Sequence, residues 1–437
     1  SGADFRMGRE GRAEFNETIA PEAADARTMG MSCLFQAREH TTPQPFTPFP
    51  WAHAYDGDDV FWLDGRGVDI RQTNFWWMEV GGMVDSIHDT EKCREELLRI
   101  AFGVWDYIKN RAPERERYAN FSLDWQSFLP GKRESRRYYG DVILNQNDVE
   151  AEGRFEDLVA YGGWSMDDHF PKGFYHRGHG TIYHPAPSPF GIPYRSLYSR
   201  NTANLFCAGR CHSATHSAMS ATRVMATCSL MGQAVGTAAA IAVRDGLGPR
   251  AVYERRIAEL QQALMDDDCW LPWHTRAISG LCRDAALSAT GGEGADFVRN
   301  GVDRPWEGCP NAWSGRLGDA LAYRFAAESE LAEARLVFDS DLNRLDPSRH
   351  GGKDRLRNMR FYVGQGDTPF APPATLVRDF RIETLGADGA WRTAAECRGN
   401  FQRLVRVPLH GRACGIRIVP ETTWGADIAR LFAFEAR

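Results

Sequence analysis

Residues 204–243 constrain the fold of this chain more than any other stretch. An apolar run, NLFCA over 204–208, ends at Gly209, and a long segment of Ala, Gly, Ser and Thr follows. The run predicts a buried strand, and Gly209 allows a sharp turn at which a ligand can approach the backbone. The order of strand, turn and small-residue helix therefore predicts one edge of a ligand-binding site.

The small-residue helix is predicted over 226–243, with Gly232, Gly236 and Ala240 on one face at spacings of four residues. Such a face can lie unusually close to a sheet or to another helix. The N-terminus of this helix offers unpaired N–H groups and the positive end of the helix dipole to an anion. Ordinary helix packing would explain the small residues alone, but the strand and Gly209 before them favour a cofactor contact.

Local patterns predict the other elements of the first 275 residues. Apolar residues at helical spacing predict amphipathic helices over 89–110 and 253–268. The segment 162–195 is rich in Gly, Pro, His and Tyr and is expected to form loops. From residue 315 onward, short alternating segments and the turn Asp388-Gly389 predict an all-β sandwich.

Length and pattern together predict two domains. The 437 residues exceed the roughly 250–300 at which a single hydrophobic core stops growing. We expect an α/β (α+β) domain over 1–275 and a sandwich over 284–437, with the boundary between 276 and 284.

Charge and cysteine pattern exclude several classes of protein. The 52 Lys and Arg against 58 Asp and Glu give a net charge of −6 with no long block of like charge, so neither nucleic acid nor an anionic membrane is expected as a partner. Ten cysteines without a C-x-x-C pair indicate neither a disulfide scaffold nor a zinc ribbon. No charge-free run of about 18 strongly apolar residues occurs, so no membrane span is expected.

Three motifs resemble the FAD-dependent oxidoreductases related to fumarate reductase and the succinate dehydrogenase flavoprotein. They are GADFRMGREGRAEF over 2–15, PGKRESRRYYGDVILNQNDV over 130–149, and residues 192–240, which contain the glycine turn and the small-residue helix. The resemblance implies the C-terminal part of an FAD-dependent oxidoreductase fold: a substrate domain with the last FAD-binding strand and helix. It also implies FAD as the cofactor.

The resemblance assigns roles to single residues. It places Arg223 close to an arginine with which related fumarate reductases bind substrate and relay protons. The other cofactor contacts it implies are Gly209 and Arg210 against the ribityl or diphosphate part of FAD, and the backbone N–H groups of Ala226, Thr227 and Cys228 at the flavin pyrimidine edge. The candidate substrate contacts are Arg136, Arg137, Tyr194, Arg195 and His179. A solvated basic loop is the alternative for Arg136 and Arg137.

The histidines near Gly209 are candidates for proton transfer. His212 and His216 are four residues apart, a spacing that zinc sites use, but no carboxylate stands beside them on a convincing helix, so no metal is expected. Acid–base chemistry or hydrogen bonding to substrate is favoured, because an unperturbed histidine titrates near neutrality. The cysteines 207, 211 and 228 also flank this segment, and packing explains them better than a redox disulfide.

The chain departs from the family in one large respect. Those enzymes begin with a G-x-G-x-x-G turn that holds the FAD pyrophosphate, followed by an acidic residue for the ribose, and no such fingerprint occurs here. The start of the sequence corresponds to a point just after a family turn of the Ala-Thr-Gly-Asp-Gly type. We therefore expect half of the cofactor site to lie on a second polypeptide that carries G-x-G-x-x-G, either a processed fragment or a separate subunit.

The C-terminal segments 378–396 and 415–436 resemble discoidin-like, galactose-binding jelly-roll sandwiches. Such modules bind sugars or act as spacers, and Trp306, Trp313 and Trp424 could stack on sugar or pack in the core. The function implied is hydride transfer between FAD and a small hydroxylated, sugar-like substrate. The alternatives are a C=C reductase of the fumarate reductase type, and a carbohydrate-binding or scaffold protein with a vestigial flavin site.

Overall fold

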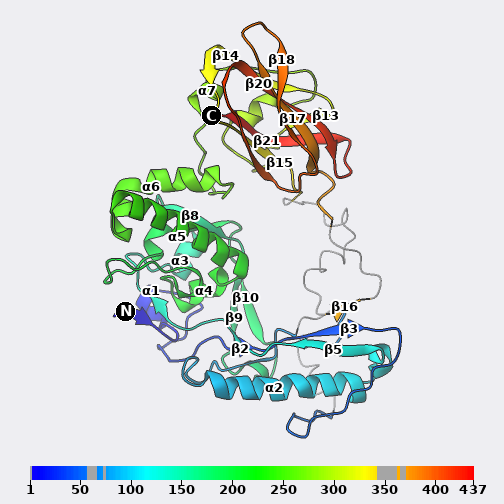
Figure 1. The fold of residues 1–437 in the computed structure, drawn as a ribbon. Coiled ribbons are helices and arrows are strands. Elements are labelled where there is room, and N and C mark those ends of the chain that lie inside the picture. The colour runs from blue at the N-terminus through cyan, green and yellow to red at the C-terminus, as the bar shows by residue number, and fades with distance from the viewer. Residues whose placement is uncertain (1, 57–65, 72–74, 342–361, 365–370) are drawn as a thin grey trace. The chain divides into compact units, whose positions relative to one another are not determined.

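Two compact units make up the chain (Figure 1). The computed structural model describes residues 2–56, 66–71, 75–341, 362–364 and 371–437. Unit 1 comprises Ser1–Gln261 with His350–Thr368, and unit 2 comprises Gln262–Arg349 with Pro369–Arg437.

The units divide at residue 262, earlier than the boundary of 276 to 284 expected from sequence. Residues 262–275 associate with unit 2 because Arg335 of a sandwich strand donates hydrogen bonds to the carbonyl oxygens of Met265 and Asp266. Pattern reasoning placed the boundary where strands begin and could not anticipate this contact.

Unit 1 combines short strands with helices. Its strands are β1 (Phe5–Arg6), β2 (Met31–Ser32), β3 (Phe35–Glu39), β4 (Glu79–Val80), β5 (Phe121–Gln126), β6 (Gly131–Lys132), β7 (Arg137–Tyr138), β8 (Leu158–Gly162), β9 (Met166–His169), β10 (Thr181–His184), β11 (Phe190–Pro193) and β16 (Tyr362–Val363). Its helices are α1 (Arg12–Phe15), α2 (Thr90–Asp106), α3 (Gln146–Glu150), α4 (His216–Thr222), α5 (Met225–Asp245) and α6 (Pro249–Asp266), the last of which ends in unit 2. The strands form the small sheets β1-β7, β10-β9, β11-β8, β4-β2-β6 and β16-β3-β5. Only the β16–β3 pair among these described strands is parallel, so the arrangement is of the α+β kind.

The amphipathic helix expected over 89–110 is confirmed as α2, which continues as a π-helical turn over Tyr107–Arg111. Its apolar face, including Leu97 and Ile100, is fully buried in a core that also contains Trp77. Strand β4 packs against α2, and this contact fixes the position of Glu79.

The expectation of loops over 162–195 is wrong. Strands β9 and β10 form an antiparallel hairpin in which Asp167 lies opposite Tyr183 and His169 opposite Thr181, and β11 pairs with β8. The Gly and Pro content of the segment indicated loops, but β9 and β10 fit between those residues, and β11 includes Gly191 and Pro193. Strand β9 packs against α4, as Figure 1 allows the reader to follow.

The buried strand expected over 204–208 does not form. Phe206 makes one isolated antiparallel bridge with Tyr198, and no ladder extends from it. Leu205 and Phe206 are partly exposed. A strand needs a neighbour along its length to satisfy its backbone groups, and a single bridge does not provide one.

The small-residue helix is confirmed as α5, but no described residue packs closely against Gly232 or Gly236 on its small face. A Cβ added at Gly232 or Gly236 would have no atom within 4 Å, and Ala240 is exposed. By length and apolar composition α5 could cross a membrane, although 33% of the apolar window is buried inside the chain. One such helix is weak evidence of a membrane span, since the core helix of a soluble protein meets the same criteria.

Unit 2 is the β-sandwich that the sequence predicts. One sheet has the order β12-β14-β20-β17-β18 and the other β13-β21-β15-β19, with all pairs antiparallel. The strands are β12 (Ala286–Ala289), β13 (Trp313–Arg316), β14 (Leu321–Glu330), β15 (Glu333–Phe338), β17 (Val377–Leu385), β18 (Trp391–Cys397), β19 (Leu404–Pro408), β20 (Arg412–Thr423) and β21 (Ile428–Ala436); the short helix α7 (Gly280–Arg283) precedes them.

The hairpin between β17 and β18 contains Asp388-Gly389, with Gly389 at φ = +79° as the turn requires. Trp313 is fully buried and donates its indole N–H to the carbonyl of Gly291, so it belongs to the core of the sandwich. Trp424, by contrast, is 38% exposed.

Candidate active site

Helix α4 is the buried centre of unit 1. All seven of its residues are buried, and its N-cap residue, Thr215, accepts a hydrogen bond from the N–H of Ala218. Thr215 donates its hydroxyl to Glu17 over 2.6 Å, and the N–H of His216 donates to Glu10 over 2.8 Å. Buried carboxylates thus satisfy the amino end of α4, where the helix dipole favours negative charge.

A carboxylate–imidazole–carboxylate chain runs through His216. Its Nδ1 lies 2.8 Å from Oε2 of Glu134, and its Nε2 lies 3.0 Å from Oδ1 of Asp168. Burial lowers the pKa of His216, but the two carboxylates outweigh burial and raise it to about 10. Both ring nitrogens therefore carry protons at neutral pH and donate to the carboxylates.

A second chain of the same kind runs through His169. Its Nδ1 lies 2.6 Å from Oε2 of Glu79, and its Nε2 lies 3.4 Å from Oδ2 of Asp167. Burial raises the pKa of Asp167, but the hydrogen bond and charge of His169 and the charge of Arg223 outweigh burial and lower it to about 2. Arg133 approaches Oε2 of Glu79 to 3.3 Å, so Glu79 lies between two basic side chains.

The two chains lie on opposite faces of the β9–β10 hairpin. Successive side chains of a strand point to opposite faces, so Asp167 reaches His169 while Asp168 reaches His216. Sequence reasoning missed both aspartates, as well as Glu79 and Glu134. The alternation within Met166–His169 was a signal for the aspartates, but nothing in the local sequence marks either glutamate as buried.

Arg223 connects the second chain to the start of α5. It is the C-cap residue of α4, and its Nη2 donates to the carbonyl oxygen and to Oδ2 of Asp167, each 3.0 Å away. The residue is 8% exposed, and its buried Nε has no hydrogen-bond partner among the described residues. Burial and the neighbouring Arg133 lower the pKa of Arg223, yet a guanidinium stays charged at neutral pH.

The residues expected to contact FAD lie together at the start of α5. Gly209 has φ = +71°, and a Cβ there would lie 3.7 Å from Cβ of Cys228. The N-cap residue of α5, Val224, makes no side-chain cap, and Ala226 is exposed while Thr227 is buried. The first N–H groups of this 21-residue helix are thus open to an anionic ligand.

Arg210 connects this region to the last residue of strand β6. Its Nε donates to the carbonyl of Arg223 at 3.1 Å, and its Nη1 donates to the carbonyl of Lys132 at 2.8 Å. The structure therefore brings Gly209, Arg210 and Arg223 together, as the sequence predicts.

His212 differs sharply from His216. It is fully buried, its Nδ1 donates to the carbonyl of Gly209 at 2.8 Å, and burial lowers its pKa to about 4. A neutral, fully buried ring supports the turn at Gly209 and has no route to a substrate. The structure thus favours a structural role over the catalytic one expected from sequence.

Most of the other predicted substrate contacts are engaged within unit 1. Arg137 is 1% exposed and binds Glu10 and the carbonyls of Ala214 and Gly8. Tyr194 is fully buried and donates to the carbonyl of Pro249, and Arg195 binds both oxygens of Asp157. Arg136 lies over the ring of Phe5 at 5.0 Å. His179, in contrast, is exposed beside the second chain. The roles of Arg136, Arg137, Tyr194 and Arg195 stay predictions.

The histidine–carboxylate chains are not a metal site. Across the part of the chain that the structure describes, no group of three or more His, Cys, Asp or Glu side chains is arranged to hold a metal ion. The imidazole nitrogens that could bind a metal are instead occupied by hydrogen bonds to carboxylates.

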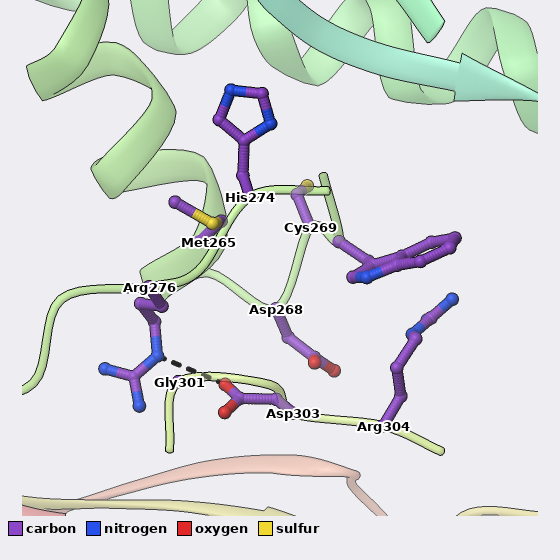
Figure 2. Close-up of a pocket in the computed structure, with 9 residues that line it drawn as sticks. Met265, Asp268, Cys269, His274, Arg276, Gly301, Asp303 and Arg304 are labelled. Atoms are coloured by element: carbon purple, nitrogen blue, oxygen red, sulfur yellow. Dashed lines mark hydrogen bonds and ion pairs between the residues drawn. The ribbon is translucent and has the colours of Figure 1, made fainter. Parts of the chain in front are cut away.

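A pocket in unit 2 is lined by paired charges (Figure 2). Arg276 donates from Nε to Asp303 at 3.2 Å, and Arg304 lies over the ring of Trp270 at 4.5 Å. The volume of about 20 Å³ has room for little more than one water molecule. It is too small for a sugar.

A larger cavity of about 370 Å³ lies in unit 1 beside the N-terminus of α6. Two arginines line it, but Arg200 binds Asp4 at 2.9 Å and Arg250 binds Asp141 at 2.7 Å. Its positive charges are thus already neutralised by protein carboxylates.

Comparisons with known proteins identify the family of the first part of the chain. The family model described as FAD dependent oxidoreductase matches residues 1–264. No curated protein matches the chain. The family 32 carbohydrate-binding module of Streptococcus pneumoniae EndoD is similar at 19% identity and a TM-score of 0.27, over 36% of this chain and 99% of that one. The family 32 module of C. perfringens NanJ in complex with galactose is similar at 14% identity and a TM-score of 0.24, over 36% of this chain and 95% of that one.

Proposed function

The chain belongs to the FAD-dependent oxidoreductase family, whose model matches residues 1–264, and from that premise we propose that it transfers a hydride between FAD and a small hydroxylated, sugar-like substrate. The observation that carries the proposal is Arg223. Its buried guanidinium lies between the open N-terminus of α5 and the Glu79–His169–Asp167 chain, and its Nε has no hydrogen-bond partner in the part of the chain that the structure describes.

The residues at the start of α5 fit the anionic edge of a flavin. The N–H groups of residues 225–227 and the helix dipole favour negative charge, and Gly209 leaves space where a side chain would obstruct a ligand. FAD supplies a two-electron acceptor and donor at its isoalloxazine ring when bound. No G-x-G-x-x-G run for the pyrophosphate occurs anywhere in the sequence, so these residues fit one part of the cofactor.

Proton transfer is assigned to the hydrogen-bonded chain Glu79–His169–Asp167. An alcohol that loses a hydride also loses its hydroxyl proton, and the acceptor of that proton must be unprotonated. His216 is already protonated between Glu134 and Asp168, which replaces the sequence-based hypothesis of His216 as the acid–base group. We assign the proton to the Glu79–His169–Asp167 chain, in which the Asp167 carboxylate is unprotonated at neutral pH, and substrate orientation to Arg223.

A second polypeptide that completes the cofactor site is also part of the proposal. The exposed face of α5 supports it, since Gly232, Gly236 and Ala240 present a flat surface that none of the described residues covers. Exposed apolar surfaces of this kind mark contacts with another body. We propose that the segment carrying the phosphate-binding turn packs on this face.

Carbohydrate binding by unit 2 is a second candidate function. Phe401 is 71% exposed, and Trp424, 38% exposed, donates its indole N–H to the carbonyl of the adjacent Asn400. Exposed aromatic side chains at one end of a sandwich suit the apolar face of a sugar.

The direct test of the main proposal is the flavin spectrum of the native protein. We expect stoichiometric FAD, anaerobic bleaching of its absorbance by a sugar-like alcohol, and recovery when an electron acceptor is added. A preparation that holds FAD, is not bleached by the alcohol, and regains its absorbance when an activated alkene is added to the reduced flavin would favour the C=C reductase. A preparation without flavin would favour the vestigial site.

A further inference from the structure

One face of the β9–β10 hairpin carries only polar side chains. Asp167 and His169 of β9 lie opposite Tyr183 and Thr181 of β10, and the period of a strand places all four side chains on the same face. Thr181 donates its hydroxyl to Asp167, so it belongs to the buried layer. Tyr183 is 51% exposed and forms the outer layer of the same face.

Aromatic rings surround this face. The ring of Trp76 lies 5.3 Å from that of His169 in an edge-to-face arrangement, and 6.4 Å from that of His179. The ring of His179 lies 6.2 Å from that of Tyr183. Gly180 permits the approach of Trp76, because a Cβ at position 180 would lie 3.3 Å from its indole ring. We call Trp76, His179 and Tyr183 the aromatic wall.

An accessible aromatic side chain and a buried polar atom without a partner point to a ligand at the aromatic wall. Tyr183 is 51% exposed, and Nε of Arg223 is buried without a hydrogen-bond partner among the described residues. His179 donates from Nδ1 to the carbonyl of Thr181 at 2.8 Å, so in its neutral form Nε2 is left as an acceptor. Both Tyr183 and Arg223 lie close enough to Asp167 to interact with it electrostatically.

We propose that the aromatic wall binds a six-membered polyhydroxylated ring of the pyranose class, with its C–H face against Trp76 and Tyr183. Its hydroxyl groups accept from Arg223 and Tyr183 and donate to Nε2 of His179. An aromatic face suits the apolar side of a pyranose, and a few convergent polar groups fix its orientation. The identity of this ring as the substrate rests on the proposed function, whereas its binding does not.

Two probes distinguish a neutral sugar from an acidic sugar as the ligand of the aromatic wall. Methyl β-D-glucopyranoside is a neutral pyranose, and D-glucuronate adds a carboxylate for which the free edge of Arg223 is suited. Binding of either to the purified native protein, measured by saturation-transfer NMR and calorimetry, supports the proposal. Tighter binding of D-glucuronate identifies an acidic sugar, and equal binding identifies a neutral one. Failure of both probes to bind overturns the proposal.

Variants locate the binding. Tyr183→Ala and His179→Ala should weaken binding about tenfold, and Tyr183→Phe, which keeps the ring, should weaken it less. Ile182→Ala is the matched control, because Ile182 is 44% exposed on the opposite face of the same strand. Trp424→Ala tests the sandwich. Binding that is unchanged in Tyr183→Ala and lost in Trp424→Ala overturns the proposal and assigns the sugar to unit 2.

The flavin readout keeps the two proposals apart. Sugar binding that depends on Tyr183, in a protein that holds no flavin, would support the aromatic wall and defeat the proposed oxidoreductase function. Flavin that is bleached by an alcohol, with turnover and binding unaffected by Tyr183→Ala and His179→Ala, would do the reverse.

Discussion

Two consecutive helices of unit 1 invert the usual relation between composition and burial. Helix α4, HSAMSAT, is rich in polar residues, yet all seven of its residues are buried. Helix α5 is apolar, with a mean hydropathy of 1.4 over its apolar window, yet six of its 21 residues are buried. Arg223 and Val224 are the residues that join them.

The difference shows what each helix is built to contact. The polar groups of α4 are matched one by one, with Thr215 bonded to Glu17 and His216 held between Glu134 and Asp168. Burial of charge is tolerated there because every charge has a partner. Each Å² of apolar surface that α5 leaves in water lacks about 25 cal/mol of hydrophobic stabilisation. Burial against another polypeptide would supply that stabilisation.

The largest expected effect comes from removing a carboxylate that pairs with the buried cations around α4. Glu134→Ala removes the acceptor for His216 and for the N–H of Met29 and an ion-pair partner of Arg137, and leaves each of these two buried cations with one carboxylate instead of two. We expect a loss of about 3–5 kcal/mol in the free energy of unfolding, measured by chemical denaturation. The control is Glu254→Ala at an exposed site. An unchanged denaturation midpoint would show that the buried chain does not hold α4 in place.

The residue between the two helices should affect chemistry rather than folding. Arg223→Lys should retain flavin but lose about 100-fold in turnover, because a lysine cannot reproduce the planar fork that orients substrate and binds Asp167. Flavin absorbance and steady-state rates measure the two effects separately. Turnover at the wild-type rate with flavin bound would make Arg223 a structural cap.

A pH titration sharpens the comparison, because the burial of α4 depends on one proton. The pKa of His216 is raised from 6.5 to about 10, so its contribution to stability is fully present below pH 6.5 and is lost as pH rises through 10. We expect about 2 kcal/mol of this contribution to be lost between pH 7.5 and 9.

The measurement is the difference between wild type and His216→Gln in unfolding free energy at each pH. The difference is needed because burial lowers the pKa of Lys109 to about 8, and its titration acts with the opposite sign over the same range. A difference that does not change with pH would mean that His216 is neutral.

The smallest expected effect comes from the open face of α5. Gly236→Leu should leave the stability of the chain unchanged or raise it by up to about 1 kcal/mol, because Leu favours the helix and a Cβ at this position meets no atom within 4 Å. Flavin retention and recovery of an associated polypeptide should fall about tenfold. Arg255→Leu on the exposed surface of α6 is the control. Undiminished flavin in Gly236→Leu would mean that this face is simply solvated.

Local sequence predicted the parts of the site that depend on local structure. The turn at Gly209 and helix α5 follow from short-range patterns, whereas Arg223 was singled out through the family resemblance. The buried contacts between histidine or arginine and carboxylates could not be predicted, because their partners are far apart in the sequence. Glu134 contacts His216 from 82 residues away, and Glu10 contacts Arg137 from 127 residues away. The strand expected over 204–208 was wrong for a related reason, since a strand depends on a neighbour that local sequence does not specify.

The most direct test of the account is the composition of the native flavoprotein. Native mass spectrometry followed by denaturing mass spectrometry gives the mass of each polypeptide and the amount of FAD. We expect the 49.1 kDa chain to be accompanied by a second polypeptide segment that carries a glycine-rich phosphate turn, and the chain expressed alone to lose FAD on gel filtration. A single 49.1 kDa species that retains stoichiometric FAD would contradict the account.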